Sequence, residues 1–248
     1  MEPAVLREDM VDGLEYSLEE FDEAVNVAMR TVPRHEFLDA GAYDNRPNED
    51  EGTRVLAPAT VARMLTALAP EPGHSVLVVG AGIGYTTAVL AEIVGAENVQ
   101  AIDIARRIVY VARQNLAAAG YGAVLVDRGD GADGLPEYAP YDRILLEASA
   151  VEPPRALVDQ LATGGRLVMP LGAGEQSLVA VEADETLGEA EVVGRYGPVA
   201  LGPMLVEGEQ AGSRRRNRTH REDAEFAEQG YFAKHGWEYD WVDWEDHL

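Results

Sequence analysis

The feature that most constrains this chain is a glycine-rich turn between a short apolar run and a stretch of helical character. The apolar run is Ser75-Val-Leu-Val-Val79, the turn is Gly80-Ala-Gly-Ile-Gly84, and the helical stretch extends from Tyr85 to Val94. A short, continuous apolar run is typical of a strand buried in a parallel sheet. Glycines after it let a ligand approach the backbone, and the helix N-terminus offers unpaired N–H groups. The pattern favours a nucleotide-like ligand, although a tight turn without a ligand also fits.

Strand-like and helix-like segments continue to alternate after this turn. We predict strands at residues 99–103, 123–126, 141–146, 165–169 and 177–182, and helices at residues 106–119 and 153–161. Alternation at this rhythm is typical of a doubly wound, mostly parallel α/β sheet, which is a Rossmann-like fold.

Two helices are predicted ahead of the turn. The first follows a capping box at Ser17-Leu-Glu-Glu20 and ends before Pro33, and the second covers residues 58–68. The polar stretch at residues 44–53 is predicted to be a surface loop. We therefore divide the chain into an N-terminal helical segment at 1–70, a core domain at 71–212 and a C-terminal tail at 213–248.

The chain is strongly acidic, with a formal net charge of −24, and Lys234 is its only lysine. The acidic residues are spread along the whole chain, which favours a halophilic protein of a salt-rich cytosol over an acidic partner-binding surface. In such a cytosol, salt screens the self-repulsion of the fold. The same charge repels phosphates, so no nucleic acid partner is expected.

Several other function classes are disfavoured by what the sequence lacks. Cysteine is absent, which excludes disulfides and thiolate metal sites, and the scattered histidines predict no metal site. No apolar run approaches the roughly 18 residues that a membrane-spanning helix needs. The first residues lack the pattern of a signal peptide. We therefore expect a cytoplasmic protein without a membrane partner.

The tail differs in composition from the rest of the chain. Arginines cluster at residues 214–221, which we interpret as a charged linker, and Trp237, Trp241 and Trp244 follow with the spacing of one helix face. We expect this face to pack on the same molecule or on a second subunit, which would make a homo-oligomer. Docking to a separate partner is the alternative.

Two acidic residues follow predicted strands at the edge of the sheet that carries the glycine turn. Asp103 ends the strand at 99–103, where a carboxylate can accept both ribose hydroxyls of a nucleoside. Asp130 stands in Gly129-Asp-Gly131, where it can accept an adenine N–H or form an ordinary Asx turn. A dinucleotide and S-adenosylmethionine both remain candidate ligands. The spacing Gly-x-Gly-x-Gly leans toward S-adenosylmethionine.

Ordered sequence blocks from about residue 15 to residue 210 resemble the protein-L-isoaspartate O-methyltransferases. The blocks are Val32-Pro-Arg-His-Glu-Phe37, Tyr43-Asp-Asn45, Ala57-Pro58, Val61-Ala-Arg-Met64, the glycine turn continued to Ala91, Gly129-Asp-Gly131, Ala139-Pro-Tyr-Asp-Arg-Ile144, Gln160-Leu-x-x-Gly-Gly-Arg-Leu-Val168 and Gly202-Pro-Met-Leu205.

The resemblance implies methyl transfer from S-adenosylmethionine to the carboxylate of an isoaspartyl residue in a damaged protein or peptide. The ester then collapses to a succinimide, which hydrolyses in part to normal aspartate, so the activity repairs proteins. For the cofactor site the resemblance and the spacing indicate Gly80, Ala81, Gly82, Gly84, Asp103, Ile104, Asp130 and Gly131.

The chain departs from the pattern of this family at five positions. Leu56 stands where the family has a serine beside the transferring methyl, and Arg54 stands where it has a threonine; we expect both to face the acceptor. Val78 replaces an acid that helps to hold the amino group of the cofactor, Ile83 replaces a small polar residue, and Glu147 replaces a threonine.

These departures leave three functions open. The first is isoaspartyl repair, the second is methylation of another acceptor, and the third is a non-catalytic protein that binds the cofactor or a partner. No catalytic residue is predicted, because the side chain of Leu56 cannot form a hydrogen bond.

Overall fold

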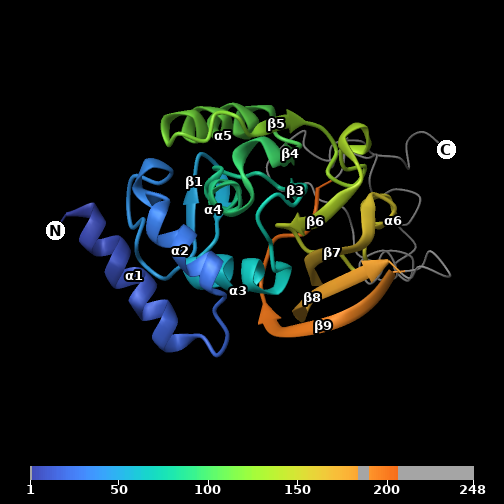
Figure 1. The fold of residues 1–248 in the computed structure, drawn as a ribbon, viewed down its shortest axis with the longest axis horizontal. Helices are drawn as coiled ribbons and strands as arrows, with labels where there is room; N and C mark the ends of the chain where they lie inside the picture. Colours follow the sequence, from blue (N-terminus) through green and yellow to red (C-terminus); the bar gives the residue numbers. More distant parts are fainter. Residues whose placement is uncertain (1, 184–189, 206–248) are drawn as a thin grey trace, which may run out of the picture.

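The computed structural model describes residues 2–183 and 190–205, and its centre is a seven-stranded sheet (Figure 1). The strand order is β5-β4-β3-β6-β7-β8-β9. Neighbouring strands from β5 to β7 are parallel, and β7, β8 and β9 pair antiparallel. The strands are β3 (Val76–Val79), β4 (Val99–Asp103), β5 (Leu125–Arg128), β6 (Tyr141–Leu146), β7 (Leu161–Leu171), β8 (Gln176–Ala183) and β9 (Ala190–Val199). The predicted Rossmann-like α/β class is confirmed.

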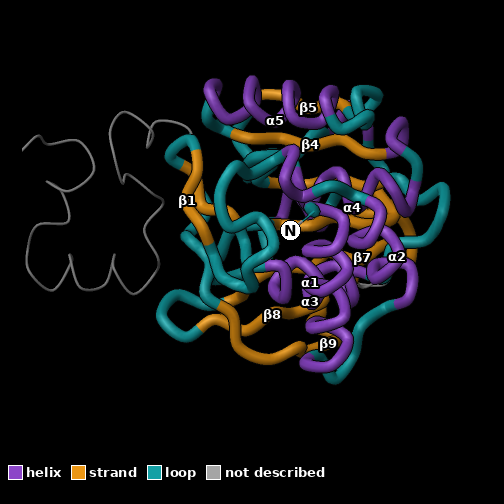
Figure 2. Tube along the Cα trace, turned by 90° about the vertical axis from the view of Figure 1, so that its left-hand side faces the viewer, coloured by secondary structure: helices purple, strands orange, loops and turns teal. Residues whose placement is uncertain are grey.

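Helices cover both faces of this sheet. One face packs against α1 (Pro3–Ser17), α2 (Glu23–Thr31), α3 (Pro58–Leu68), α4 (Tyr85–Val94) and α5 (Arg106–Ala118), and the other carries α6 (Arg155–Val158). Figure 1 places α6 on the opposite side of the molecule from α1 and α2. Figure 2 shows the strands stacked from β5 and β4 at the top to β8 and β9 at the bottom.

The central strand β3 shows why the glycine turn lies where it does. Val76 and Val78 join the apolar cluster on the α1–α5 face, whereas Leu77 and Val79 join the cluster on the α6 face. All four are at most 3% exposed. A strand buried on both faces cannot use alternating polar residues, which is why the run is continuously apolar. The next strand along the chain, β4, lies on one side of β3, and β6 lies on the other. The turn after β3 therefore opens at the switch point of the sheet.

The predicted start of the first helix was wrong. Ser17 is the last residue of α1, which the sequence analysis did not predict, and its hydroxyl donates to the carbonyl of Leu14. Asp22 caps α2 instead, because its Oδ1 accepts from the backbone N–H groups of Ala24 and Val25 at 2.9 and 3.1 Å. Ser17-Leu-Glu-Glu20 has the letters of a capping box but lies in the connection between two helices.

The polar stretch at residues 44–53 is only partly a loop. It contains a short hairpin of β1 (Asn48–Asp50) and β2 (Thr53–Val55), closed by Glu51 and Gly52 at φ of +51° and +77°. Two successive positive φ values are the signature of a tight two-residue hairpin turn, and glycine adopts one of them without strain. This hairpin stands at one edge of the molecule in Figure 2.

The other departures are at the edge of the sheet and at element ends. Strand β9 was not predicted, and the helix expected at residues 153–161 is the four-residue α6, because β7 already begins at Leu161. Much of β9 is exposed, and Gly194, Gly197 and Pro198 interrupt its pattern. Helix α3, helix α4 and strand β4 have the predicted bounds.

Some predictions concern residues outside the described ranges. The arginine cluster and the three tryptophans of the tail lie outside the described residues, and so does any role of the tail in a homo-oligomer. In the described ranges, no helix is long and apolar enough to cross a membrane. The same ranges contain no group of three or more His, Asp or Glu side chains arranged to hold a metal ion.

Candidate active site

A cavity of about 270 Å³ lies at the carboxyl ends of β3, β4 and β6. Its walls come from the hairpin end, the glycine turn, the start of α5, the end of β6 and the segment after β9. The lining residues are Gly52, Thr53, Arg54, Leu56, Val79, Gly80, Gly82, Ile102, Asp103, Ile104, Ala105, Ile108, Gly131, Glu147, Ala148 and residues 201–205. A larger, more open hollow of about 810 Å³ lies between α1 and residues 35–45, but it contains none of the predicted site residues.

The glycine turn brings its backbone to the cavity. Gly80, Gly82 and Gly84 have φ values of +92°, +52° and +93°, a region that L side chains rarely adopt. Gly80 and Gly82 line the cavity. Gly84 instead lets α4 approach α5, since a Cβ there would lie 3.2 Å from Cγ of Leu116. Ala81 is buried and is not part of the cavity wall.

Asp103 is held at the end of β4 by the backbone around it. Its Oδ2 accepts from the N–H of Gly82 at 3.2 Å, and its Oδ1 accepts from the N–H of Ala105 at 3.0 Å. Burial raises the pKa of Asp103 above its ordinary value, and these backbone hydrogen bonds oppose that rise. Each carboxylate oxygen has a further lone pair, so this group can accept two neighbouring hydroxyls. Ile104 lines the cavity beside it.

The loop after β5 contributes Gly131 rather than Asp130 to the cavity wall. Oδ1 of Asp130 accepts from the N–H of Ala132 at 2.9 Å, as in an Asx turn. A Cβ at position 131 would lie 2.5 Å from Cγ1 of Val79, which leaves no room for any residue except glycine. The loop can therefore pass close to the glycine turn.

Arg54 and Leu56 lie where the hairpin meets the cavity. Leu56 is 8% exposed, and its carbonyl accepts from Nη2 of Arg34 at 2.6 Å. Arg54 is exposed. Both residues also line an adjoining open hollow of about 410 Å³ that extends toward Pro198. They therefore stand between the cavity and a surface from which a second molecule could approach.

The five positions that depart from the family pattern do not share one environment. Arg54, Leu56 and Glu147 line the cavity, but Val78 is fully buried and Ile83 packs in the same apolar cluster as Val78. Burial raises the pKa of Glu147 to about 7, while a hydrogen bond with Thr86 and the charge of Arg34 oppose the rise. From the sequence, Glu147 was predicted to depart from the family pattern but not to bind the cofactor.

Part of the cavity wall was not predicted from the sequence. Ile108, Ala148 and residues 201–205 line it, although none was named as a site residue. The backbone N–H of Ser149 donates to the carbonyl of Gly202 at 2.8 Å, which fixes the last segment beside the end of β6. The Gly202-Pro-Met-Leu205 block was the available signal, because it belongs to the ordered series of family blocks.

Comparison with known proteins decides the family. The model of the protein-L-isoaspartate (D-aspartate) O-methyltransferase family (PCMT) matches residues 7–199. The chain belongs to this family. Protein-L-isoaspartate O-methyltransferase of Aeropyrum pernix is 45% identical over 161 residues, which cover 62% of this chain and 62% of that enzyme. Protein-L-isoaspartate O-methyltransferase 2 of Polaromonas sp. is 42% identical over 192 residues, which cover 74% of this chain and 88% of that enzyme.

A solved structure of the family confirms the fold. It is a Plasmodium falciparum chain described as a protein-L-isoaspartate O-methyltransferase (PCMT) in complex with S-adenosyl-L-homocysteine. The TM-score is 0.70 at 22% identity, and the match covers 80% of this chain and 97% of that chain. At this identity the likeness establishes the fold alone.

Proposed function

We propose that this protein is an S-adenosylmethionine-dependent methyltransferase that methylates the carboxylate of L-isoaspartyl residues in damaged proteins. The observation that carries the proposal is the cavity at the switch point of the sheet. Backbone of Gly80 and Gly82, the carboxylate of Asp103 and the close approach of Gly131 meet there in a chain that belongs to this family.

The residues of the cavity suit the parts of the cofactor. Asp103 offers acceptors for two ribose hydroxyls, and Gly131 lines the cavity beside Val79 without a side chain that would take up room there. When bound, S-adenosylmethionine supplies an electrophilic methyl on a sulfonium whose departure leaves a neutral thioether. The acceptor carboxylate has a pKa near 4, so it is ionised at neutral pH and needs no general base.

The protein's contribution to this reaction is placement and partial desolvation of the acceptor. Leu56 offers the acceptor side of the cavity only an apolar surface, because a leucine side chain has no hydrogen-bonding group. Arg54 stands beside it with five N–H donors and can pair with a carboxylate in a bidentate manner. We therefore infer that Arg54, rather than residue 56, orients the acceptor in this protein.

The test is transfer of a tritiated methyl group from S-adenosylmethionine to an isoaspartyl peptide, with the matching aspartyl peptide as control. We expect base-labile label on the isoaspartyl peptide alone. Arg54→Gln should raise the KM for this peptide more than it changes the affinity for the cofactor. Label on both peptides, or on neither, would contradict isoaspartyl repair.

A second candidate function, methylation of a different acceptor, is favoured by one observation. Leu56 replaces the family's serine at the wall of the cavity, whereas Asp103 and the glycines are present. Cofactor binding without transfer to the isoaspartyl peptide would support this function. Restored transfer in Leu56→Ser would then identify the leucine as the cause. Absence of both binding and transfer would point to a non-catalytic relative.

We further propose that the protein is adapted to high salt, because its net charge is −24 with a single lysine. The assay should therefore be run in molar potassium chloride as well as in dilute buffer. Location in the cytoplasm stays a prediction.

A further inference from the structure

Among the described residues, two carboxylates line the cavity, and they differ in their hydrogen bonds. Asp103 accepts backbone hydrogen bonds on both of its oxygens. Glu147 is half-buried as a residue, but its Oε1 is out of contact with solvent and has no hydrogen-bond partner among the described residues. A shielded carboxylate oxygen without a donor is costly, because it loses water and gains nothing in return.

Groups from three parts of the fold act on this carboxylate. Arg34, just after α2, attracts it, Asp103 at the end of β4 repels it, and Thr86 at the start of α4 forms a hydrogen bond with it. Arg34 does not satisfy Oε1: its Nη2 donates to the carbonyl of Leu56, and its planar group lies 4.3 Å from the ring centre of Tyr85. In the described part of the chain, the Nε and Nη1 atoms of Arg34 also have no hydrogen-bond partner. An ion pair with Arg34 therefore does not compensate for the burial of Oε1 of Glu147.

The register of β3 and β6 explains where this carboxylate lies. Val78 pairs with Leu145, so their side chains leave the sheet on the same face, and Glu147, two residues further along, points the same way. The backbone N–H of Glu147 donates to the carbonyl of Val79 at 2.8 Å, and its Cβ lies against Gly80. The acid that this chain lacks at position 78 is thus present one strand away, beside the glycine turn.

We propose that Glu147 is a cofactor-binding residue whose carboxylate accepts a hydrogen bond from the ammonium group of S-adenosylmethionine. This inference rests on the proposed function. The cofactor carries two cationic groups, but only the ammonium has N–H donors, and a lone acceptor oxygen needs a donor. Asp103 is placed for the ribose, which leaves Glu147 as the second carboxylate of the cavity wall for the methionine end. Rotation of the terminal torsion of a glutamate is soft enough to aim the oxygen at a ligand.

The pH dependence of binding follows from this assignment. Burial raises the pKa of Glu147 in the free protein, so part of the population holds a proton at neutral pH. An ammonium pairs with the ionised form only, and binding therefore releases that proton. Affinity for an ammonium-bearing ligand should fall as the pH is lowered from 8 to 6. Arg34 attracts the Glu147 carboxylate and Asp103 repels it, so their effects on its pKa oppose each other.

Calorimetric titration with three ligands tests the proposal on the intact chain. S-adenosylhomocysteine has the ammonium, its deaminated analogue lacks only that group, and 5′-methylthioadenosine lacks the whole amino acid end. Glu147→Gln keeps the shape of the side chain and removes its charge. It should weaken S-adenosylhomocysteine binding roughly 10- to 100-fold, the range for losing one charge-assisted hydrogen bond. Binding of the other two ligands should be unchanged.

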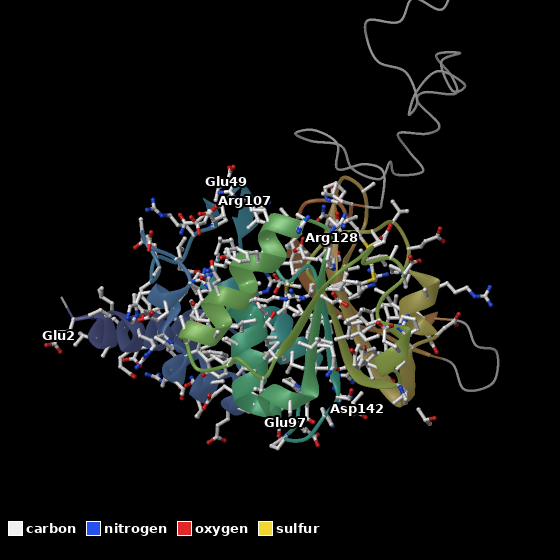
Figure 3. The ribbon with its side chains drawn as sticks, turned by 90° about the horizontal axis from the view of Figure 1, so that it is seen from above. Glu2, Glu49, Glu97, Arg107, Arg128 and Asp142 are labelled. Atoms are coloured by element: carbon white, nitrogen blue, oxygen red, sulfur yellow. The ribbon has the colours of Figure 1, made fainter. Side chains whose placement is uncertain are left out.

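The matched control is Glu97→Gln. Glu97 is exposed at the amino end of β4, and Figure 3 shows it on the opposite side of the molecule from Glu49 of the hairpin and Arg107 of α5. The substitution Glu97→Gln should leave the affinities for all three ligands unchanged.

Two results would overturn the inference. An equal loss for all three ligands would show that Glu147→Gln damages the site in general, and an unchanged affinity for S-adenosylhomocysteine would show that the ammonium lies elsewhere. If the unaltered protein binds none of the ligands, the proposed function fails and this inference fails with it. Titration of the unaltered protein therefore distinguishes failure of the proposed function from failure of this inference alone.

Discussion

Glu147→Gln should stabilise the ligand-free protein, and the gain should grow with pH. Burial raises the pKa of Glu147 from an ordinary 4.5 to about 7 in the folded protein. Between these values the folded protein holds a proton that the unfolded chain has released. Stability of the unaltered protein therefore falls as the pH rises through this window. The cost is absent below 4.5 and complete above about 7.

The size of the effect follows from the same two values. Each pKa unit corresponds to about 1.4 kcal/mol, so the shift costs about 3 kcal/mol at pH 8. Glutamine mimics the protonated carboxyl, so this figure is the upper limit of the gain. For a protein of this size, 3 kcal/mol raises Tm by roughly 6–12 °C.

The assay is urea unfolding of the unaltered protein, Glu147→Gln and the control Glu97→Gln at pH 5 and pH 8. We expect a gain for Glu147→Gln at pH 8, little change at pH 5, and no change for the control at either pH. A loss of stability at pH 8 would refute the reasoning, because it would show that the carboxylate stabilises the fold by pairing with Arg34. Saturating S-adenosylhomocysteine at pH 8 should stabilise the unaltered protein more than Glu147→Gln, because only the unaltered protein has a carboxylate that pairs with the ammonium of the ligand.

Three further outcomes are expected. Asp103→Asn should weaken S-adenosylhomocysteine and 5′-methylthioadenosine alike, by roughly tenfold or more, because both ligands carry the ribose; a loss confined to one of them would contradict the ribose assignment. Gly131→Ala should lower the free energy of unfolding by about 1–3 kcal/mol, since its Cβ would clash with Val79, and an unchanged urea midpoint would argue against that contact. Because the net charge is −24, thermal unfolding should move to higher temperature between 0.1 M and 2 M potassium chloride. A flat response to salt would count against salt adaptation.

The central sheet could be predicted from sequence because its strands are buried on both faces. Burial forces continuous apolar runs such as Val76–Val79 and residues 144–146 of β6, and short glycine or polar turns separate the strands from the helices. Strand β9 has no such constraint, since one side of it is open to solvent and glycines interrupt it. The hairpin of β1 and β2 is too short and too polar for a pattern to reveal it. In both cases pairing with a neighbour, rather than local preference, makes the strand.

Part of the candidate site could likewise be predicted from the sequence, and part could not. The glycine turn and Asp103 could be named in advance because their spacing is local: one strand, one turn and the end of the next strand. Glu147 lies 67 residues beyond Gly80, and only the pairing of β3 with β6 brings the two side by side. Its unpartnered oxygen is a property of the packed interior, to which Arg34 and Tyr85 also contribute. Sequence could mark position 147 as unusual but could not show that it lies in the cavity.

If Glu147 supplies the carboxylate that is missing at position 78, the departures from the family pattern have a different interpretation. Taken separately, they suggest a chain that has lost an acid from its cofactor site and gained an unrelated one. In the structure Val78 lies on β3 and Glu147 directly follows the neighbouring strand β6, so two carboxylates line the cavity among the described residues. The remaining departures at the cavity are Arg54 and Leu56, and both lie between it and the adjoining surface hollow. The differences that matter for function are therefore on the acceptor side, which favours a changed way of holding the acceptor over a lost cofactor.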